Sequence, residues 1–179
     1  MMIKEKIKEY QYKKYIEEHK GNIEKAFVEL STCPDLDWLI TEDLSCKLFE
    51  RIKIHDDSKY STEEFDAYRW FYYPANKLEK AVGNYFFESA WKHHYENNDH
   101  HWQCPKRQIE EFTEEIELAC LENICDWLAM GYKFNDRPIH YYNKHKDEIC
   151  LPKKQITLME NVMTDLEKTK RDITKYGTI

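Results

Sequence analysis

Residues 106–130 read KRQIEEFTEEIELACLENICDWLAM, and this segment carries the clearest helical pattern in the chain. Apolar side chains recur there at steps of three and four residues, which is the spacing of one face of an α-helix. The predicted face consists of Ile109, Phe112, Ile116, Ala119, Asn123, Asp126 and Met130. Asp126 is therefore a carboxylate on a largely apolar stripe, where an unpaired charge is unfavourable.

The same spacing predicts helices on both sides of this segment. We expect them over residues 5–30, 41–54 and 76–96, in a short piece before Pro74, and from Pro152 onward. Their predicted inward residues are Tyr15, Ile16, His19, Ile23, Ala26, Phe27 and Leu30; Leu44, Leu48, Phe49 and Ile52; Leu78, Val82, Phe86, Ala90, His93 and His94; and Ile156, Met159, Val162, Met163, Leu166 and Ile173. The sequence thus predicts an all-α, single-domain helical bundle over residues 1–179.

Three local patterns refine this prediction. Gly21 lowers helix propensity by about 1 kcal/mol relative to Ala, which makes it a candidate break in the first helix. The run Ser61-Thr62-Glu63-Glu64 has the form of a capping box for the short helix. The aromatic segment from Lys133 to Tyr142 has room for a short hairpin.

Composition excludes several classes of protein. The chain has 179 residues, 27 Lys and Arg against 34 Asp and Glu, and a net charge of -7, which argues against a grip on extended nucleic acid. Four Gly and five Pro are too few for a fold of many short strands. The sequence has no long apolar run and no C-x-x-C pair among its six cysteines. We expect a soluble cytoplasmic protein with free thiols and no membrane partner; if it is phage-encoded, we expect it in the host cytoplasm. Among the cysteines, Cys120 is expected in the core.

Seven polar side chains are candidates for a metal site. His19, His94 and Asp126 lie on inward helix faces, while His55 and Asp56 follow the end of a predicted helix. A polar loop adds His100 and His101. Burying these groups is unfavourable without partners, and imidazole with carboxylate is a common ligand set for transition metals.

Each of these residues also has an ordinary structural explanation. Taken alone, His19 could be a hydrogen-bonded histidine of the core. His100 and His101 are adjacent and could lie in a solvent-exposed loop. Asp126 could form an ion pair with Arg69 or Arg107. Their order and inward positions together favour a metal site. The helical pattern leaves His93 as a reserve for His94, and it does not decide between His100 and His101 as the ligand. His140 and His145 lie in an unpatterned segment and are expected to be exposed.

The order of these residues resembles the HD-domain superfamily of metal-dependent phosphohydrolases, whose pattern is H, HD, D on a helical bundle. The resemblance is carried by His19-Lys20-Gly21-Asn22-Ile23, His55-Asp56-Asp57-Ser58-Lys59 and Ile124-Cys125-Asp126-Trp127. The second stretch is similar to the HD-x-x-K run of HD-GYP phosphodiesterases, but no Gly-Tyr-Pro element follows, so a cyclic dinucleotide substrate is not implied. The chain most closely resembles an uncharacterised family of small bacterial and phage proteins with H-x-x-x-N-x-H-H and D-W-x-x-M signatures, matched here by His94 to His101 and Asp126 to Met130.

The resemblance implies hydrolysis of a small phosphoester, such as a nucleotide, at one or two divalent ions of Mn, Fe, Ni, Zn or Mg. Asp56 is expected to bridge two ions, with His19, His55 and Asp126 on one and His94 with His100 or His101 on the other. Lys59 would neutralise a phosphate oxygen, and the histidine not used as a ligand, taken as His101, would protonate the leaving group. Asn98 and Trp102 are further substrate-binding candidates.

Two other functions share these features. HD-type diiron oxygenases use a similar ligand order, and a non-catalytic, metal-stabilised binding protein would account for the acidic, aromatic-rich composition. The sequence predicts neither the substrate nor the oligomeric state.

Overall fold

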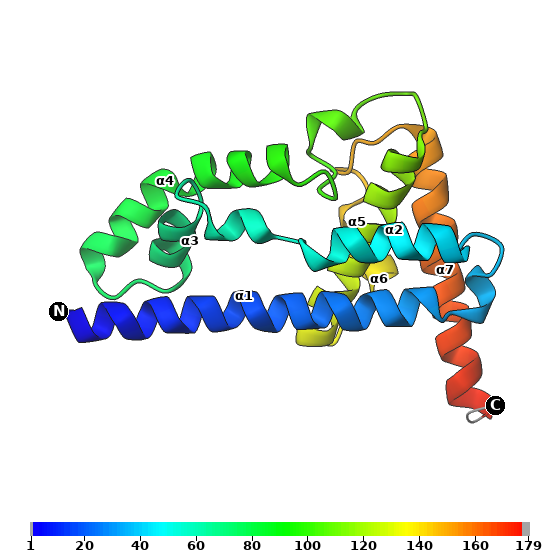
Figure 1. Cartoon of the computed structure of the whole chain (residues 1–179), viewed down its shortest axis with the longest axis horizontal. Coiled ribbons are helices and arrows are strands. Elements are labelled where there is room, and N and C mark those ends of the chain that lie inside the picture. The colour runs from blue at the N-terminus through cyan, green and yellow to red at the C-terminus, as the bar shows by residue number, and fades with distance from the viewer. Residues whose placement is uncertain (1, 177–179) are drawn as a thin grey trace.

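Helix α1, Met2–Ser31, spans most of the long axis of the molecule (Figure 1). The computed structural model describes the backbone of residues 2–176 and the side chains of residues 3–171. The remaining elements within this range are α2 (Glu42–Lys53), α3 (Phe65–Tyr72), α4 (Lys77–Asn97), α5 (Glu114–Phe134), α6 (Pro138–His145) and α7 (Lys153–Tyr176), with 3-10 turns at Pro34–Leu36, Asp57–Tyr60 and Pro105–Arg107. No strand occurs among the described residues, which confirms the all-α prediction.

Two hydrophobic clusters hold these helices together. The larger one joins the C-terminal half of α1 to α2, α5 and α7, while the smaller one joins the N-terminal half of α1 to α3 and α4. Along α1, Ile16 belongs to the smaller cluster and Ile23 to the larger. His19 lies between them and is buried, so the polar candidates gather at the junction of the two clusters.

Several predicted boundaries and faces are wrong. Helix α1 passes through Gly21 without a break. Helix α5 begins at Glu114, because the Thr113 side chain accepts the amide hydrogen of Ile116 as an N-cap, and the preceding segment leaves Ile109 exposed. Residues 138–145 form helix α6 where a hairpin was allowed, since Pro138 occupies its first turn.

The buried face of α4 also differs from the prediction. Leu78 and Phe86 are exposed, whereas Gly83 is buried and Phe87 packs against the smaller cluster. A Cβ atom on Gly83 would lie 2.4 Å from the backbone nitrogen of Phe71, so this glycine allows α3 to approach α4 closely.

The face of α7 agrees with the sequence prediction, and that of α2 agrees except at Phe49. On α7, Met159, Val162, Met163 and Leu166 are buried as predicted, and the side chain of Ile173 lies outside the described residues. On α2, Leu44, Leu48 and Ile52 are buried but Phe49 is exposed. All six cysteines are free thiols, and Cys120 is in the core. None of the described helices is long and apolar enough to cross a membrane.

Candidate metal centre

Asp56 lies at the centre of the polar cluster. It follows the C-terminal end of α2, and its backbone adopts the left-handed conformation with φ 60° and ψ 16°. Few non-glycine residues adopt this conformation, and Asp tolerates it better than most. The turn leaves the Asp56 carboxylate 1% exposed, between α1, α4 and the loop that follows α4.

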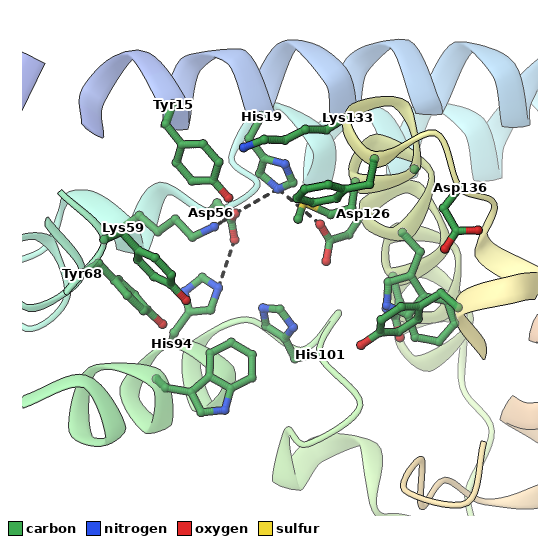
Figure 2. Close-up of a pocket in the computed structure, with 18 of the residues that line it drawn as sticks. Tyr15, His19, Asp56, Lys59, Tyr68, His94, His101, Asp126, Lys133 and Asp136 are labelled. Atoms are coloured by element: carbon green, nitrogen blue, oxygen red, sulfur yellow. Dashed lines mark hydrogen bonds and ion pairs between the residues drawn. The ribbon is translucent and has the colours of Figure 1, made fainter. Parts of the chain in front are cut away.

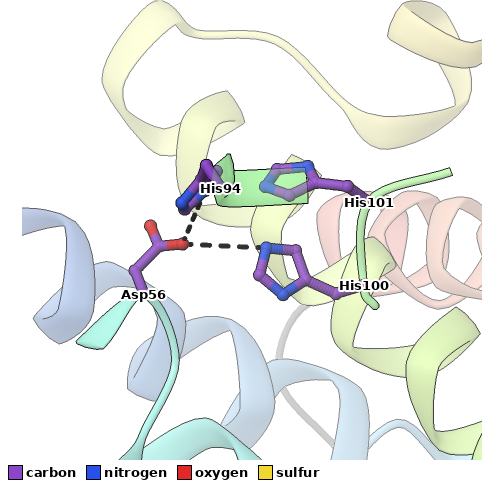
Figure 3. A group of neighbouring side chains, drawn as sticks. All are labelled: Asp56, His94, His100 and His101. Atoms are coloured by element: carbon purple, nitrogen blue, oxygen red, sulfur yellow. Dashed lines mark ion pairs between the residues drawn. The ribbon is translucent and has the colours of Figure 1, made fainter. Parts of the chain in front are cut away.

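Four imidazole rings direct their Nε2 atoms at this carboxylate. His19 and His55 face Oδ2 at 3.3 and 3.6 Å. His94 and His100 face Oδ1 at 3.2 and 3.7 Å (Figure 3). The two oxygens of Asp56 therefore serve two different pairs of histidines.

Around Asp56, two groups of donor atoms have metal-binding dimensions. One consists of Asp56, His94, His100 and His101, and the other of His19, His55 and Asp126, with the donor atoms of each group lying within 4.8 Å of one another. A third group of the same dimensions, His55, His100 and Glu122, shares two histidines with them. His19 Nε2 is 3.2 Å from Asp126 Oδ1 (Figure 2). All the predicted ligands thus come together, and both His100 and His101 belong to one group.

Two glutamates hold the opposite sides of these rings. Glu122 Oε1 lies 2.8 Å from His55 Nδ1 and 3.2 Å from His100 Nδ1, and Glu64 Oε2 lies 2.8 Å from His94 Nδ1. A carboxylate on Nδ1 sets the tautomer that leaves Nε2 free to bind a metal. Sequence reasoning missed both residues, although Glu122 is one turn before Asp126 on the same helix.

The position of Glu64 corrects the capping-box prediction. The Glu64 side chain makes no cap hydrogen bond at the start of α3. It is fully buried and binds His93 and His94 instead. His94 faces Asp56, whereas His93 contacts the cluster only through Glu64.

Several buried polar atoms of the cluster have no hydrogen-bond partner. They are His55 Nε2, Asp56 Oδ1, His100 Nε2 and His101 Nε2. His94 Nε2 and His100 Nε2 approach Asp56 Oδ1 at 3.2 and 3.7 Å, but neither contact has the geometry of a hydrogen bond. Leaving a buried polar atom unpaired costs about 1–3 kcal/mol, and four of them in one place are unusual. All four belong to residues of these groups, so bound cations would satisfy them. The donor set therefore fits metal ions.

The favoured protonation states differ among the residues of this cluster. Burial by itself would raise the pKa of Asp56, but Lys59 and the surrounding imidazoles hold it well below its usual value. Burial lowers the pKa of His55 and that of His101. Asp56, His55 and His101 therefore favour the forms that bind metals. Burial is outweighed by contacts with Asp126 and Asp56, which raise the pKa of His19 to about 9, and by contacts with Asp56 and Glu64, which raise that of His94, so a bound cation would have to displace a proton from each of these two rings.

The other predicted site residues lie around this cluster. Lys59 Nζ forms an ion pair with Asp56 Oδ2, and Trp102 lines the adjoining cavity. Asn98 donates to Ser58 Oγ and to the His94 carbonyl and is not among the cavity residues, so it supports His94 from behind. Neither arginine considered as a partner pairs with Asp126: Arg69 binds Glu79 and Arg107 binds Gln155. His140 is exposed, His145 is half-buried, and both lie outside the metal-binding groups.

A cavity of about 740 Å³ opens onto the cluster. This volume is in the range of small-molecule sites. Its polar floor includes His19, Asp56, Lys59, His94, His101 and Asp126. Its aromatic walls include Tyr12, Tyr15, Tyr68, Tyr72, Tyr73, Phe87, Trp91, Trp102, Trp127, Phe134 and Tyr141. The Lys133 ammonium lies 4.3 Å from the centre of the Tyr15 ring, beside His19 (Figure 2).

The fold and this cluster define an all-helical protein with a buried histidine–carboxylate centre that could hold metal ions. The chain belongs to the family of unknown function DUF5662, whose model matches residues 8–172. No curated protein and no solved structure matches it significantly.

Proposed function

We propose that this chain is a metal-dependent phosphohydrolase that acts on a small phosphoester, such as a nucleotide, at a dinuclear site. The observation that carries the proposal is the geometry at Asp56. Each of its two carboxylate oxygens faces a different pair of histidines. A carboxylate in this position is suited to bridge two cations. The order of His19, His55-Asp56 and Asp126 also supports a relation to the HD-domain superfamily.

Divalent ions in such a site lower the pKa of water and neutralise charge on a phosphoryl group. The chain's own residues would position the reactants. Lys59, held by Asp56 at the cavity floor, would bind a phosphoryl oxygen. His101 lines the cavity with an unpaired Nε2 atom. Burial lowers its pKa and favours the neutral ring, so it would serve as a third nitrogen ligand of its group, or protonate the leaving group after taking up a proton.

The experiment measures metal content and hydrolysis together. The purified chain, reconstituted anaerobically with Mn²⁺, Fe²⁺, Ni²⁺ or Zn²⁺, should retain close to two equivalents by elemental analysis. It should then hydrolyse bis(p-nitrophenyl) phosphate or a member of a nucleotide panel. Asp126→Ala should lose both properties. Asp57→Asn is the matched control, because Asp57 pairs with Lys20 outside the cluster. A chain that retains no metal would refute the proposal.

The aromatic walls favour one alternative, a diiron oxygenase acting on an apolar substrate. Few cationic side chains line the cavity, and Lys59 and Arg137 are already paired with carboxylates. An iron-loaded chain that consumes oxygen and leaves every phosphoester intact would support this function over hydrolysis.

A further inference from the structure

The side chain of Tyr68, on α3, has a buried hydroxyl group without a partner. The residue is 5% exposed, and its Oη atom makes no hydrogen bond among the described residues. It lines the same cavity as the metal cluster. Figure 2 shows it on the side of the cavity occupied by Lys59 and His94, and its ring meets the His94 ring edge-on at 6.0 Å between centroids.

Packing does not account for this hydroxyl group. The Tyr68 ring packs against Phe87 and His94, and a phenylalanine ring would make the same contacts. Elsewhere in the structure, Tyr132 donates to Glu29 at 2.6 Å and Tyr142 donates to Glu160 at 2.9 Å. Buried polar groups normally have such partners. An unpaired hydroxyl group at the wall of a cavity therefore indicates a partner that enters the cavity.

The chemistry of that partner follows from the surroundings. A tyrosine phenol carries its proton at neutral pH, so the Tyr68 hydroxyl group is available to donate a hydrogen bond. A neutral phenol is not among the usual metal ligands. The partner is thus a hydrogen-bond acceptor, located near the Lys59 ammonium and the metal-binding cluster. An anionic oxygen meets both requirements.

We propose that Tyr68 Oη donates a hydrogen bond to a phosphoryl oxygen of the substrate and forms, with Lys59, an oxyanion-binding subsite beside the metal centre. This inference rests on the proposed phosphohydrolase function and adds a substrate-binding residue to it.

The test compares Tyr68→Phe with Tyr142→Phe in the metal-loaded full chain. Tyr68→Phe should keep the wild-type metal content and a melting temperature at or above that of the wild type. Its affinity for inorganic phosphate, measured by calorimetry, should fall tenfold or more, and kcat/KM for bis(p-nitrophenyl) phosphate should fall 10- to 100-fold. Tyr142→Phe should melt at a lower temperature and keep the wild-type phosphate affinity.

Two results would overturn the inference alone. One is a Tyr68→Phe variant that binds phosphate as tightly as an active wild type. The other is a Tyr68→Phe variant that is less stable than an active wild type, because the hydroxyl group would then have a structural partner. A wild-type chain that holds metal but neither binds phosphate nor cleaves any phosphoester would overturn the proposed function together with this subsite, so the two failures are distinguishable.

Discussion

Replacing Glu122 by glutamine tests whether the glutamates behind the histidines prepare the metal site. Three donors face the Glu122 carboxylate. His55 Nδ1 and His100 Nδ1 share Oε1 at 2.8 and 3.2 Å, and Arg51 Nε binds Oε2 at 2.8 Å. The substitution keeps the shape of the side chain but removes its charge and one of its two acceptor oxygens.

The size of the effect follows from these contacts. If the amide oxygen of Glu122→Gln stays on the two imidazoles, its NH₂ group faces Arg51; if the amide turns over, the NH₂ group faces the imidazoles. In either orientation at least one hydrogen bond to a charged group is lost. Such a bond contributes about 1.5–3 kcal/mol to stability. Because the lost partner orients two predicted ligands, we expect metal affinity to fall roughly 10- to 100-fold.

Metal affinity can be measured by competition with a chromophoric chelator, with circular dichroism to show that the variant is folded. Glu117→Gln is the matched control, since Glu117 lies on the same helix but outside the cluster. It should bind metal like the wild type. A folded Glu122→Gln variant with wild-type affinity would refute the idea that Glu122 prepares His55 and His100 for metal binding.

Three further predictions concern single side chains. Asp56→Asn should remove most of the bound metal, measured by elemental analysis, and should keep its backbone because Asn also tolerates φ 60°; full metal content would contradict the bridging role. Arg107→Met should lower the free energy of unfolding in urea by more than about 3 kcal/mol, because it removes the hydrogen bonds that Arg107 donates to the Asp99, His100 and Ala119 carbonyls and to the Gln155 amide oxygen. A change below about 1 kcal/mol would show that other donors replace it. Gly83→Ala should lower the free energy of unfolding by about 1–3 kcal/mol in the same assay, because the new Cβ atom would force α3 away from α4. Gly21→Ala is the control, since nothing lies within 4 Å of its Cβ position, and it should stabilise the chain by about 0.5–1 kcal/mol. Equal effects of the two substitutions would contradict the close approach at Gly83.

Helical periodicity predicted the type of most elements because long amphipathic segments carry a repeated signal. It predicted α7 well, since Met159, Val162 and Leu166 repeat on one face. It failed at α4, where Gly83 rather than a large apolar residue marks the contact with α3. A close backbone approach leaves no hydrophobic signature in the sequence. The start of α5 was missed for a similar reason, because one hydrogen bond, from the Ile116 amide to the Thr113 hydroxyl oxygen, decides it.

The candidate site was predictable only where residues break an expected pattern. His19 and Asp126 are noticeable in the sequence because they are polar residues on apolar helix faces. In the structure, His19 Nε2 lies 3.2 Å from Asp126 Oδ1. Glu64 fits a local capping motif, which predicts a hydrogen bond from a backbone amide to its side chain. In the structure the Glu64 carboxylate binds His93 and His94 instead. An unpaired hydroxyl group such as that of Tyr68 has no sequence signal at all, since it depends on what the fold places around it.

Charge links the number of bound ions to the kind of substrate. The cluster contains more carboxylates than cationic side chains: Asp56, Glu64, Glu122 and Asp126 against Arg51 and Lys59. Arg51 also forms an ion pair with Asp99, so with neutral imidazoles at least two negative charges stay uncompensated. One divalent ion would only neutralise the centre, and a second would make it positive and attractive to a phosphoester even in a chain of net charge -7. A measurement of the metal stoichiometry therefore tests the class of substrate. Two bound ions would favour an anionic substrate, and a single ion would favour a neutral one.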